Sequence, residues 1–254
     1  MEQGSIYSAL SGALSLQRRM DTVSNNLANA NTTGYKADQT LFQGVLADAQ
    51  RGEGAGESSQ DLVYPVLEGQ NTDFDQGSLK QTGRSLDMAL EGDGFFQVRT
   101  GEDGSAYTRH GKFQVTAEGR LTDTQGRAVL NTDGEPIDLP SRDVSVNGAG
   151  EVFVPGQQAP VTQLAVQQPG EGTRMIKQGD NLLQPAGAGG DQAMVAAEDA
   201  DVRSGYLEQS NVNTMREMVR MIDVQRSYQS ITKSMSTIDQ TFSDASRQLA
   251  QLQG

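Results

Sequence analysis

The sequence predicts an α+β protein in which a central antiparallel β domain is flanked by an N-terminal and a C-terminal helix that pair. Near both ends of the chain, apolar residues recur at steps of three and four, the spacing of one helix face. Between the ends, short alternating segments are separated by Gly-containing turns, the pattern of antiparallel strands. Apolar residues make up 35% of the 254 residues and aromatic residues 5%, which predicts a small core with much loop.

The N-terminal helix is predicted from an apolar stripe that continues for about seven turns. Several of its positions are small, so a partner helix can approach closely. No complementary helix follows nearby in the sequence. The members of this N-terminal stripe are Ile6, Ala9, Ala13, Leu16, Met20, Val23, Leu27 and Ala30.

The C-terminal segment Leu207 to Leu252 contains neither Pro nor Gly, so it predicts one long helix, with Ser210 or Asn213 as the N-cap. Its apolar residues fall into two stripes that do not share a heptad phase. The change falls near Gln225 to Tyr228 and predicts a changed face or a local irregularity. The first stripe is Val212, Met215, Val219 and Ile222, and the second is Ile231, Met235, Ile238, Phe242, Ala245, Leu249 and Leu252.

The central strands are predicted from segments such as "GFFQVRT", "SAYTRH", "KFQVT" and "PVTQLAVQQ". A hairpin is expected across Asn147-Gly148. Two Gly-rich segments without apolar periodicity, Ala49 to Gln60 and Gln184 to Ala193, are expected to be mobile. The predicted organisation is a helical assembly domain (1–34 with 205–254), a connecting segment (35–76) and a β-rich domain (77–204).

Composition disfavours several functional classes. A net charge of −13 disfavours nucleic acid as a partner, because binding duplexes needs Lys and Arg at the phosphates. The absence of Cys removes disulfides and thiolate metal sites. No run approaches the roughly 20 apolar residues of a membrane span, so no direct membrane insertion is expected. The first 19 residues lack the basic start and unbroken apolar run of a secretory signal peptide.

Catalytic and metal-binding patterns are weak. The single histidine, His110, precedes a Gly in "YTRHGKF" and is better explained as part of a turn between strands than as a catalytic base. Asp73 and Asp75 resemble the start of a calcium loop, but the twelfth position is Arg84 rather than Glu. We therefore expect no enzyme activity, no metal and no cofactor.

Three separated motifs resemble the bacterial flagellar rod and hook family. The first is "SNNLANANTTGYK" (Ser24 to Lys36), within an N-terminal segment most similar to the proximal-rod members. The second comprises "LDMALEGDGFFQV" and "AYTRHGKFQV" in the centre, and the third is "LEQSNVNTMREMVRMIDVQRSYQSITKSMSTIDQT" near the C-terminus. The resemblance covers nearly the whole chain, and the motifs keep the family's order.

The resemblance implies a structural subunit of the proximal rod of the flagellar basal body. Such subunits pair their terminal helices and pack against copies of themselves and other rod proteins in a helical tube. They are exported by the flagellar type III apparatus without cleavage of a signal peptide.

The Asn residues at the end of the first helix then have a physical interpretation. Asn25, Asn26, Asn29 and Asn31 can form hydrogen bonds across a crowded interface and fix its register, as a single polar residue in a helix–helix stripe does. The alternative is a frayed, solvated helix end. Gly34 is expected to stop the helix in the left-handed conformation.

Other identities stay open at this level. The distal-rod protein shares the C-terminal motif, but a longer insertion is expected in it between the first helix and the β domain. A hook protein is disfavoured because the chain is too short for an extra outer domain. In other classes, a secreted coiled-coil adhesin fits the helices, and an enzyme is the weakest fit.

Replacing Leu27 with Asp tests the N-terminal stripe. An unpaired charge buried in a dry interface costs several kcal/mol, so motility should be lost while the central domain folds normally. Swimming assays together with circular dichroism of the purified variant check this. Normal swimming would show that Leu27 is not in the interface.

Overall fold

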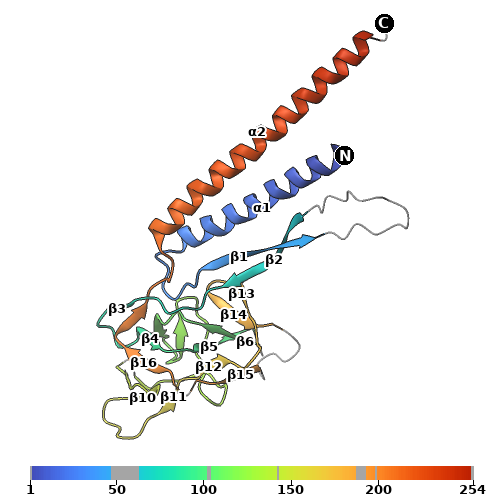
Figure 1. Ribbon diagram of the computed structural model, residues 1–254. Coiled ribbons are helices and arrows are strands. Elements are labelled where there is room, and N and C mark those ends of the chain that lie inside the picture. The colour runs from blue at the N-terminus through green and yellow to red at the C-terminus, as the bar shows by residue number, and fades with distance from the viewer. Residues whose placement is uncertain are drawn as a thin grey trace, which may run out of the picture. The chain divides into compact units, whose positions relative to one another are not determined.

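The computed structural model describes the chain in two compact units (Figure 1). The helical unit comprises Met1–Ala28, Asp38–Asn71 and Asn213–Gly254, and the β unit comprises Asn29–Ala37 and Thr72–Val212. In the part of the chain that the structure describes, two helices and otherwise antiparallel strands make the protein α+β, as predicted. The residues described are 2–46, 63–101, 104–141, 143–186, 193–197 and 199–252.

In the helical unit, α1 (Glu2–Ala28) lies alongside α2 (Thr214–Leu252) (Figure 1). The helices approach closely at Gly12, where a Cβ atom would lie 3.3 Å from Ile231 Cδ1. The strands β1 (Asp38–Leu46) and β2 (Val63–Thr72) pair with each other, and β1 contacts α1. Small residues on α1 thus permit the close approach of α2.

The ends of the helices follow the sequence signals. Asn213 caps α2, because its Oδ1 accepts the backbone N–H of Arg216 at 3.0 Å and its carbonyl accepts that of Glu217. This confirms Asn213 rather than Ser210 as the cap. Beyond α1, Gly34 has φ of 69°, which confirms the predicted left-handed conformation.

The path of α2 confirms one expectation and corrects another. The helix begins at Thr214, directly after the Asn213 cap, and it continues to Leu252 as one α-helix, as predicted. Its buried and half-buried positions keep a single phase, so the expected change near Gln225 to Tyr228 is absent from this described part of the helix. These positions are Thr214, Glu217, Met221, Val224, Tyr228, Ile231, Met235 and Ile238.

The β unit contains a six-stranded sheet in the order β13-β14-β6-β5-β12-β15, three two-stranded sheets (β16-β4, β17-β3, β7-β8) and the three-stranded β11-β10-β9. The register pairs Phe96 with Thr108 and Val166 with Phe96. The strands are β3 (Leu79–Gln81), β4 (Met88–Glu91), β5 (Phe95–Thr100), β6 (Gly104–Thr108), β7 (Phe113–Val115), β8 (Leu121–Asp123), β9 (Ser145–Val146), β10 (Glu151–Phe153), β11 (Thr162–Gln163), β12 (Val166–Pro169), β13 (Met175–Gly179), β14 (Leu182–Pro185), β15 (Met194–Ala196), β16 (Asp201–Ser204) and β17 (Tyr206–Glu208).

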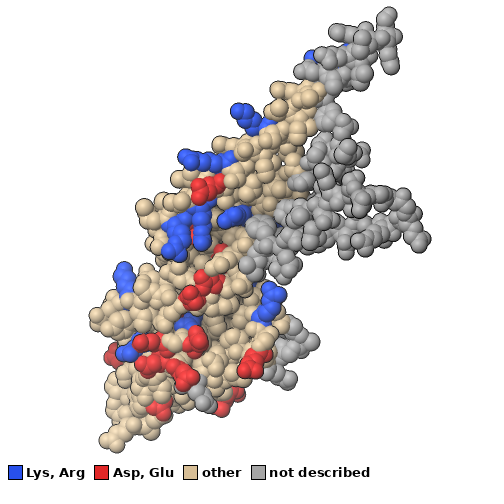
Figure 2. Space-filling model, viewed as in Figure 1, with Lys and Arg blue, Asp and Glu red and all other residues tan. Residues whose placement is uncertain are grey.

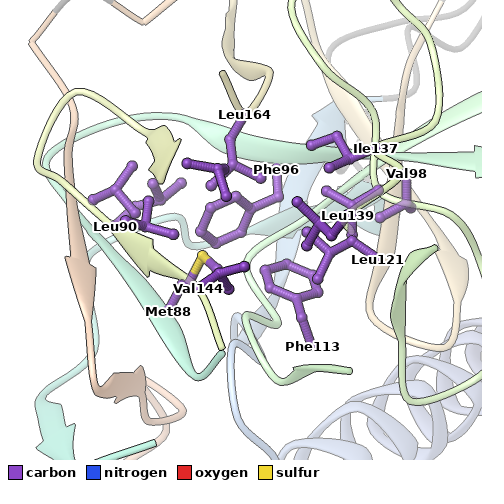
Figure 3. Packing of buried hydrophobic residues seen from close by; sticks show 14 of the residues in the cluster. Met88, Leu90, Phe96, Val98, Phe113, Leu121, Ile137, Leu139, Val144 and Leu164 are labelled. Carbon is purple, nitrogen blue, oxygen red and sulfur yellow. The ribbon is translucent and has the colours of Figure 1, made fainter. Parts of the chain in front are cut away.

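The main core of the β unit is a cluster of aliphatic side chains around two phenylalanines (Figure 3). Phe96 and Phe113 meet edge to face with ring centroids 5.2 Å apart. Met88, Leu90 and Leu164 pack around Phe96 in the same cluster. The predicted antiparallel centre therefore has its own core.

Local turn chemistry in the β unit also follows the sequence. The hairpin expected at Asn147-Gly148 is confirmed, because β9 pairs with β10 across this turn. Gly150 closes the turn with φ of 77°. Of the two Gly-rich segments, 49–60 lies outside the described residues, as do 187–192 of the other.

The β unit includes β17 and continues to Val212, next to the start of α2. Leu207 and Glu208 are buried, and β17 pairs with β3. Gln209 continues the contact by donating its backbone N–H to the carbonyl of Ser78. Removing the chain from Leu207 onward would therefore take a strand out of the β unit.

Two truncations test this boundary. A chain ending at Val212 should keep a cooperative β-type melting transition by circular dichroism, because β17 and its pairing remain. A chain ending at Tyr206 should melt at a lower temperature or without cooperativity, because it loses two buried residues of β17. Equal transitions for the two chains would contradict the assigned boundary.

Candidate assembly site

The N-terminal stripe faces inward within the helical unit. Ala13, Leu16, Met20 and Leu27 are half-buried, and Val23 is buried. On α2, Ile231, Met235 and Ile238 of the second predicted stripe are also half-buried. The side chains of Ile6, Phe242 and Leu249 lie outside the described residues. The structure thus places the described members of both stripes on partly covered faces.

The first predicted stripe of α2 lies on a different face, open to solvent. Met215 is 72% exposed, Val219 58% and Ile222 48%, and Met218 joins them at the i+3 position. Val212 is half-buried and belongs to the β unit. An apolar face of this kind is typical of a surface that another molecule covers. We call Met215, Met218, Val219 and Ile222 the open stripe.

The structure separates the roles of the four Asn residues. Asn26 is buried, and its side chain makes two hydrogen bonds with the backbone of Asp38, donating at 2.8 Å and accepting at 2.9 Å. Asn29 accepts hydrogen bonds from Thr32 in the turn after α1. Asn25 and Asn31 are exposed. Asn26 therefore satisfies the first backbone groups of β1 from within the same chain.

Charged side chains are distributed unevenly on the face shown in Figure 2. Basic side chains predominate over the helical unit, and acidic ones gather over the β unit. On this face, the two units therefore differ in the sign of their exposed charge.

A buried ion cluster lies in the β unit and consists of Lys36, Arg109 and Glu208. Lys36 Nζ lies 2.7 Å from Glu208 Oε1, and Arg109 Nη1 lies 3.2 Å from Glu208 Oε2. All three side chains are at most 3% exposed. Sequence reasoning did not predict this cluster, because its members are far apart in the chain.

Backbone groups complete the cluster. The N–H of Gly77 donates to Glu208 Oε1 at 2.9 Å, and that of Gly34 donates to the Glu208 carbonyl at 2.9 Å. Lys36 also donates to the carbonyl of Asp75, and Arg109 to that of Gly92 at 2.6 Å. These bonds supply the polar partners that buried charges require.

Burial dominates the electrostatics of the two cations. Loss of solvation lowers the pKa of Lys36, and the nearby Glu208 carboxylate opposes this shift. Burial likewise lowers the pKa of Arg109, and Glu208 again opposes the shift. The carboxylate of Glu208 therefore stabilises the charged forms of both buried cations against the loss of solvation.

Next to the cluster, Asn211 joins three segments of the chain. Its side chain accepts the N–H of Ala37 at 2.7 Å and donates to the carbonyl of Asp73 at 2.9 Å. The N–H of Asp73 in turn donates to the carbonyl of Ala37. The β-unit ends of the segments that lead to β1, β2 and α2 are thus held together by one amide.

The histidine has a local structural role. His110 Nδ1 lies 2.6 Å from Thr33 Oγ1, and the backbone N–H of His110 donates to Thr108 Oγ1. Gly34 packs against this turn, where a Cβ atom would lie 2.5 Å from the backbone of Arg109. Within the described part of the chain, no three His, Asp or Glu side chains are grouped to hold a metal ion. No described helix is long and apolar enough to cross a bilayer.

Paired helices with an open apolar stripe, joined to a β unit that has its own core, define a structural protein built to assemble. Three family matches agree. Residues 6–36 match "Flagella basal body rod protein", 89–154 match "Flagellar hook protein FlgE/F/G D1 domain", and 203–248 match "Flagellar basal body rod FlgEFG protein C-terminal".

Similar proteins cover nearly the whole chain. The flagellar basal-body rod protein FlgG of Bacillus subtilis is 32% identical over 253 residues, which is 93% of this chain and 95% of that protein. Rod proteins named FlgF from Caulobacter vibrioides and Mesorhizobium japonicum are 32% and 30% identical, over 91% and 92% of each chain. The chain belongs to the family of flagellar basal-body rod proteins and is a structural rod subunit of the basal body.

The matched segments meet in the buried ion cluster. Lys36 ends the first matched segment, Arg109 lies in the second and Glu208 lies in the third. The three parts of the chain that carry the family resemblance are therefore joined by a single carboxylate.

Replacing Glu208 with Gln should destabilise the β unit by about 3–5 kcal/mol, because Lys36 and Arg109 would stay buried without their carboxylate partner. Urea unfolding followed by circular dichroism measures the effect. The matched control is Glu91→Gln, which breaks an exposed ion pair with Arg203 at 2.8 Å and should cost about 1 kcal/mol or less. Equal effects of the two substitutions would contradict the role given to the cluster.

Proposed function

We propose that this chain is a subunit of the proximal rod, in which its helical unit forms the axial wall and its β unit lies outside. In this proposal the domains are the helical assembly domain and the β-rich outer domain, with the segment between them as a connector. The observation that carries it is the open stripe, which the described residues of the chain leave uncovered. Its role is structural rather than catalytic.

The proposed axial pairing resembles a coiled coil. The single 3-4 phase of α2 from Glu217 to Ile238 supports it, because this spacing keeps one face toward a partner helix. The half-buried stripe of α1 supplies the other side. In this arrangement the assembly interface includes the predicted stripe residues, and the open stripe contacts neighbouring subunits.

The proximal rather than the distal rod is inferred from the connection between the first helix and the β unit. The distal-rod protein is expected to carry a longer insertion there, whereas the interval in this sequence is short and Gly-rich.

The proposed partners are copies of this chain and other rod proteins. The proposed route to the periplasm is the flagellar type III export apparatus without cleavage of a signal peptide. Mass spectrometry of the subunit from isolated basal bodies tests the route, since an intact N-terminus is expected. A secreted adhesin, the alternative class, would self-assemble without any rod partner.

Deleting the gene in its own bacterium tests the proposal. Loss of a proximal subunit should leave basal bodies without any rod by electron cryotomography, whereas loss of a distal subunit should leave a short rod. A rod of normal length in the deletion strain would contradict a rod function altogether.

Complementation of this strain tests the open stripe. Val219→Asp should fail to restore swimming although the purified variant folds normally, because the charge is solvated in the monomer and desolvated only on assembly. Gln225→Asp, at an exposed polar position of the same helix, is the matched control and should restore swimming. Restoration by Val219→Asp would exclude the open stripe from the interface.

A further inference from the structure

Two methionines of the open stripe are the most accessible methionines among the described residues. Met215 is 72% exposed and Met218 48%, and their spacing of three residues on α2 makes them neighbours on one helix face. In contrast, Met88 is fully buried in the main core of the β unit and Met194 is 8% exposed. The remaining methionines whose side chains are described are half-buried, namely Met20, Met175, Met221 and Met235. A small reagent in solution therefore reaches the thioethers of Met215 and Met218 first.

The composition of the chain directs oxidants to the same two side chains. The sequence contains neither Cys nor Trp. In a chain without thiols, the methionine thioether is the side chain that a peroxide oxidises most readily, and access to the sulfur decides which methionine reacts. Exposure and composition thus select Met215 and Met218 together.

The reaction is a two-electron oxygen transfer from a peroxide. The sulfur lone pair attacks one oxygen of hydrogen peroxide, the O–O bond breaks and an S–O bond forms. The departing hydroxide takes the proton from the transferred hydroxyl group and leaves as water. The sulfur is oxidised from thioether to sulfoxide, and the peroxide is reduced.

The product changes the chemistry of the open stripe. A sulfoxide replaces a flexible apolar side chain by a polar one that accepts hydrogen bonds. In the free subunit, water solvates the sulfoxide oxygen, because both positions are exposed. Under a neighbouring subunit the same oxygen would lose its water, and burying a polar group without a hydrogen bond is costly. Oxidation of this face therefore opposes assembly without disturbing the fold.

We propose that Met215 and Met218 form an oxidation site, at which a peroxide converts both thioethers to sulfoxides and makes the free subunit unable to assemble. The proposal rests on the proposed rod function, because it takes the open stripe as the contact between subunits. Subunits react before assembly and are protected once the stripe is covered. The site is reversible, since methionine sulfoxide reductases restore the thioether.

Timed treatment of the purified chain with hydrogen peroxide tests the reactivity. Peptide mass spectrometry should show Met215 and Met218 gaining oxygen at least about tenfold faster than Met88, because access to the sulfur sets the rate. Met221 lies on the partly covered face of the same helix and is the internal control, which should react more slowly than Met215. Equal rates at Met215 and Met221 overturn the proposal.

Complementation of the deletion strain tests the consequence for assembly. The double variant Met215→Gln and Met218→Gln places a polar amide where the sulfoxide forms, and it should lose incorporation into isolated basal bodies. The matched double variant Met215→Leu and Met218→Leu keeps apolar side chains of similar volume that peroxide does not oxidise, and it should incorporate like the unmodified chain.

Equal incorporation of the two double variants overturns the proposal, because the polarity of these positions would then not matter for assembly. Absence of the unmodified chain from basal bodies would instead refute the rod function. The failure of this inference and the failure of the proposed function are therefore distinguishable.

Discussion

The buried carboxylate of Glu208 is the constraint on which the rest of the β unit depends. It pairs with Lys36 and Arg109 and accepts a hydrogen bond from Gly77, so four segments of the chain converge on one residue. Removing it would leave two cations without solvent or counter-charge, the costly outcome for a buried pair. Further close contacts surround this carboxylate. Gly34 approaches the backbone of Arg109 too closely for a side chain, and Asn211 joins the backbones at Ala37 and Asp73.

The helix α2 has two apolar faces, one that is partly covered within the chain and one that is exposed. One face of α2, from Met221 to Ile238, is partly covered within the chain, and Gly12 lets Ile231 approach α1. The described residues leave the open stripe around Val219 exposed. Burial of apolar area contributes about 25 cal/mol per Å², so covering this face favours association without altering the fold of the subunit. Stability and assembly therefore depend on different sides of the same helix.

Much of the fold was predictable from local patterns, and the exceptions have physical causes. The α1 stripe, the Asn213 cap, the Gly34 stop and the Asn147 hairpin each depend on neighbouring residues alone, so the sequence was sufficient. The phase of α2 was wrong because Met215, Val219 and Ile222 are apolar yet exposed, while a charged residue, Glu217, occupies a buried position. Stepping back from Ile231 by three and four would have found Tyr228, Val224, Met221 and Glu217. The ion cluster gave no local signal, since Glu208 lies 172 residues from Lys36 and 99 from Arg109.

The uniform 3-4 repeat of α2 has a consequence for recognition. A helix whose pattern recurs every seven residues looks nearly the same after sliding by about 10.5 Å along its axis. Apolar contact alone then does not determine the register, because a partner helix could pack at several positions along the axis with similar energy. Glu217 is the one charged residue among the buried and half-buried positions of the described repeat, so it breaks this degeneracy at a single place. Glu217 therefore fixes the register of the helix pairing, and with it the position of every other contact along α2.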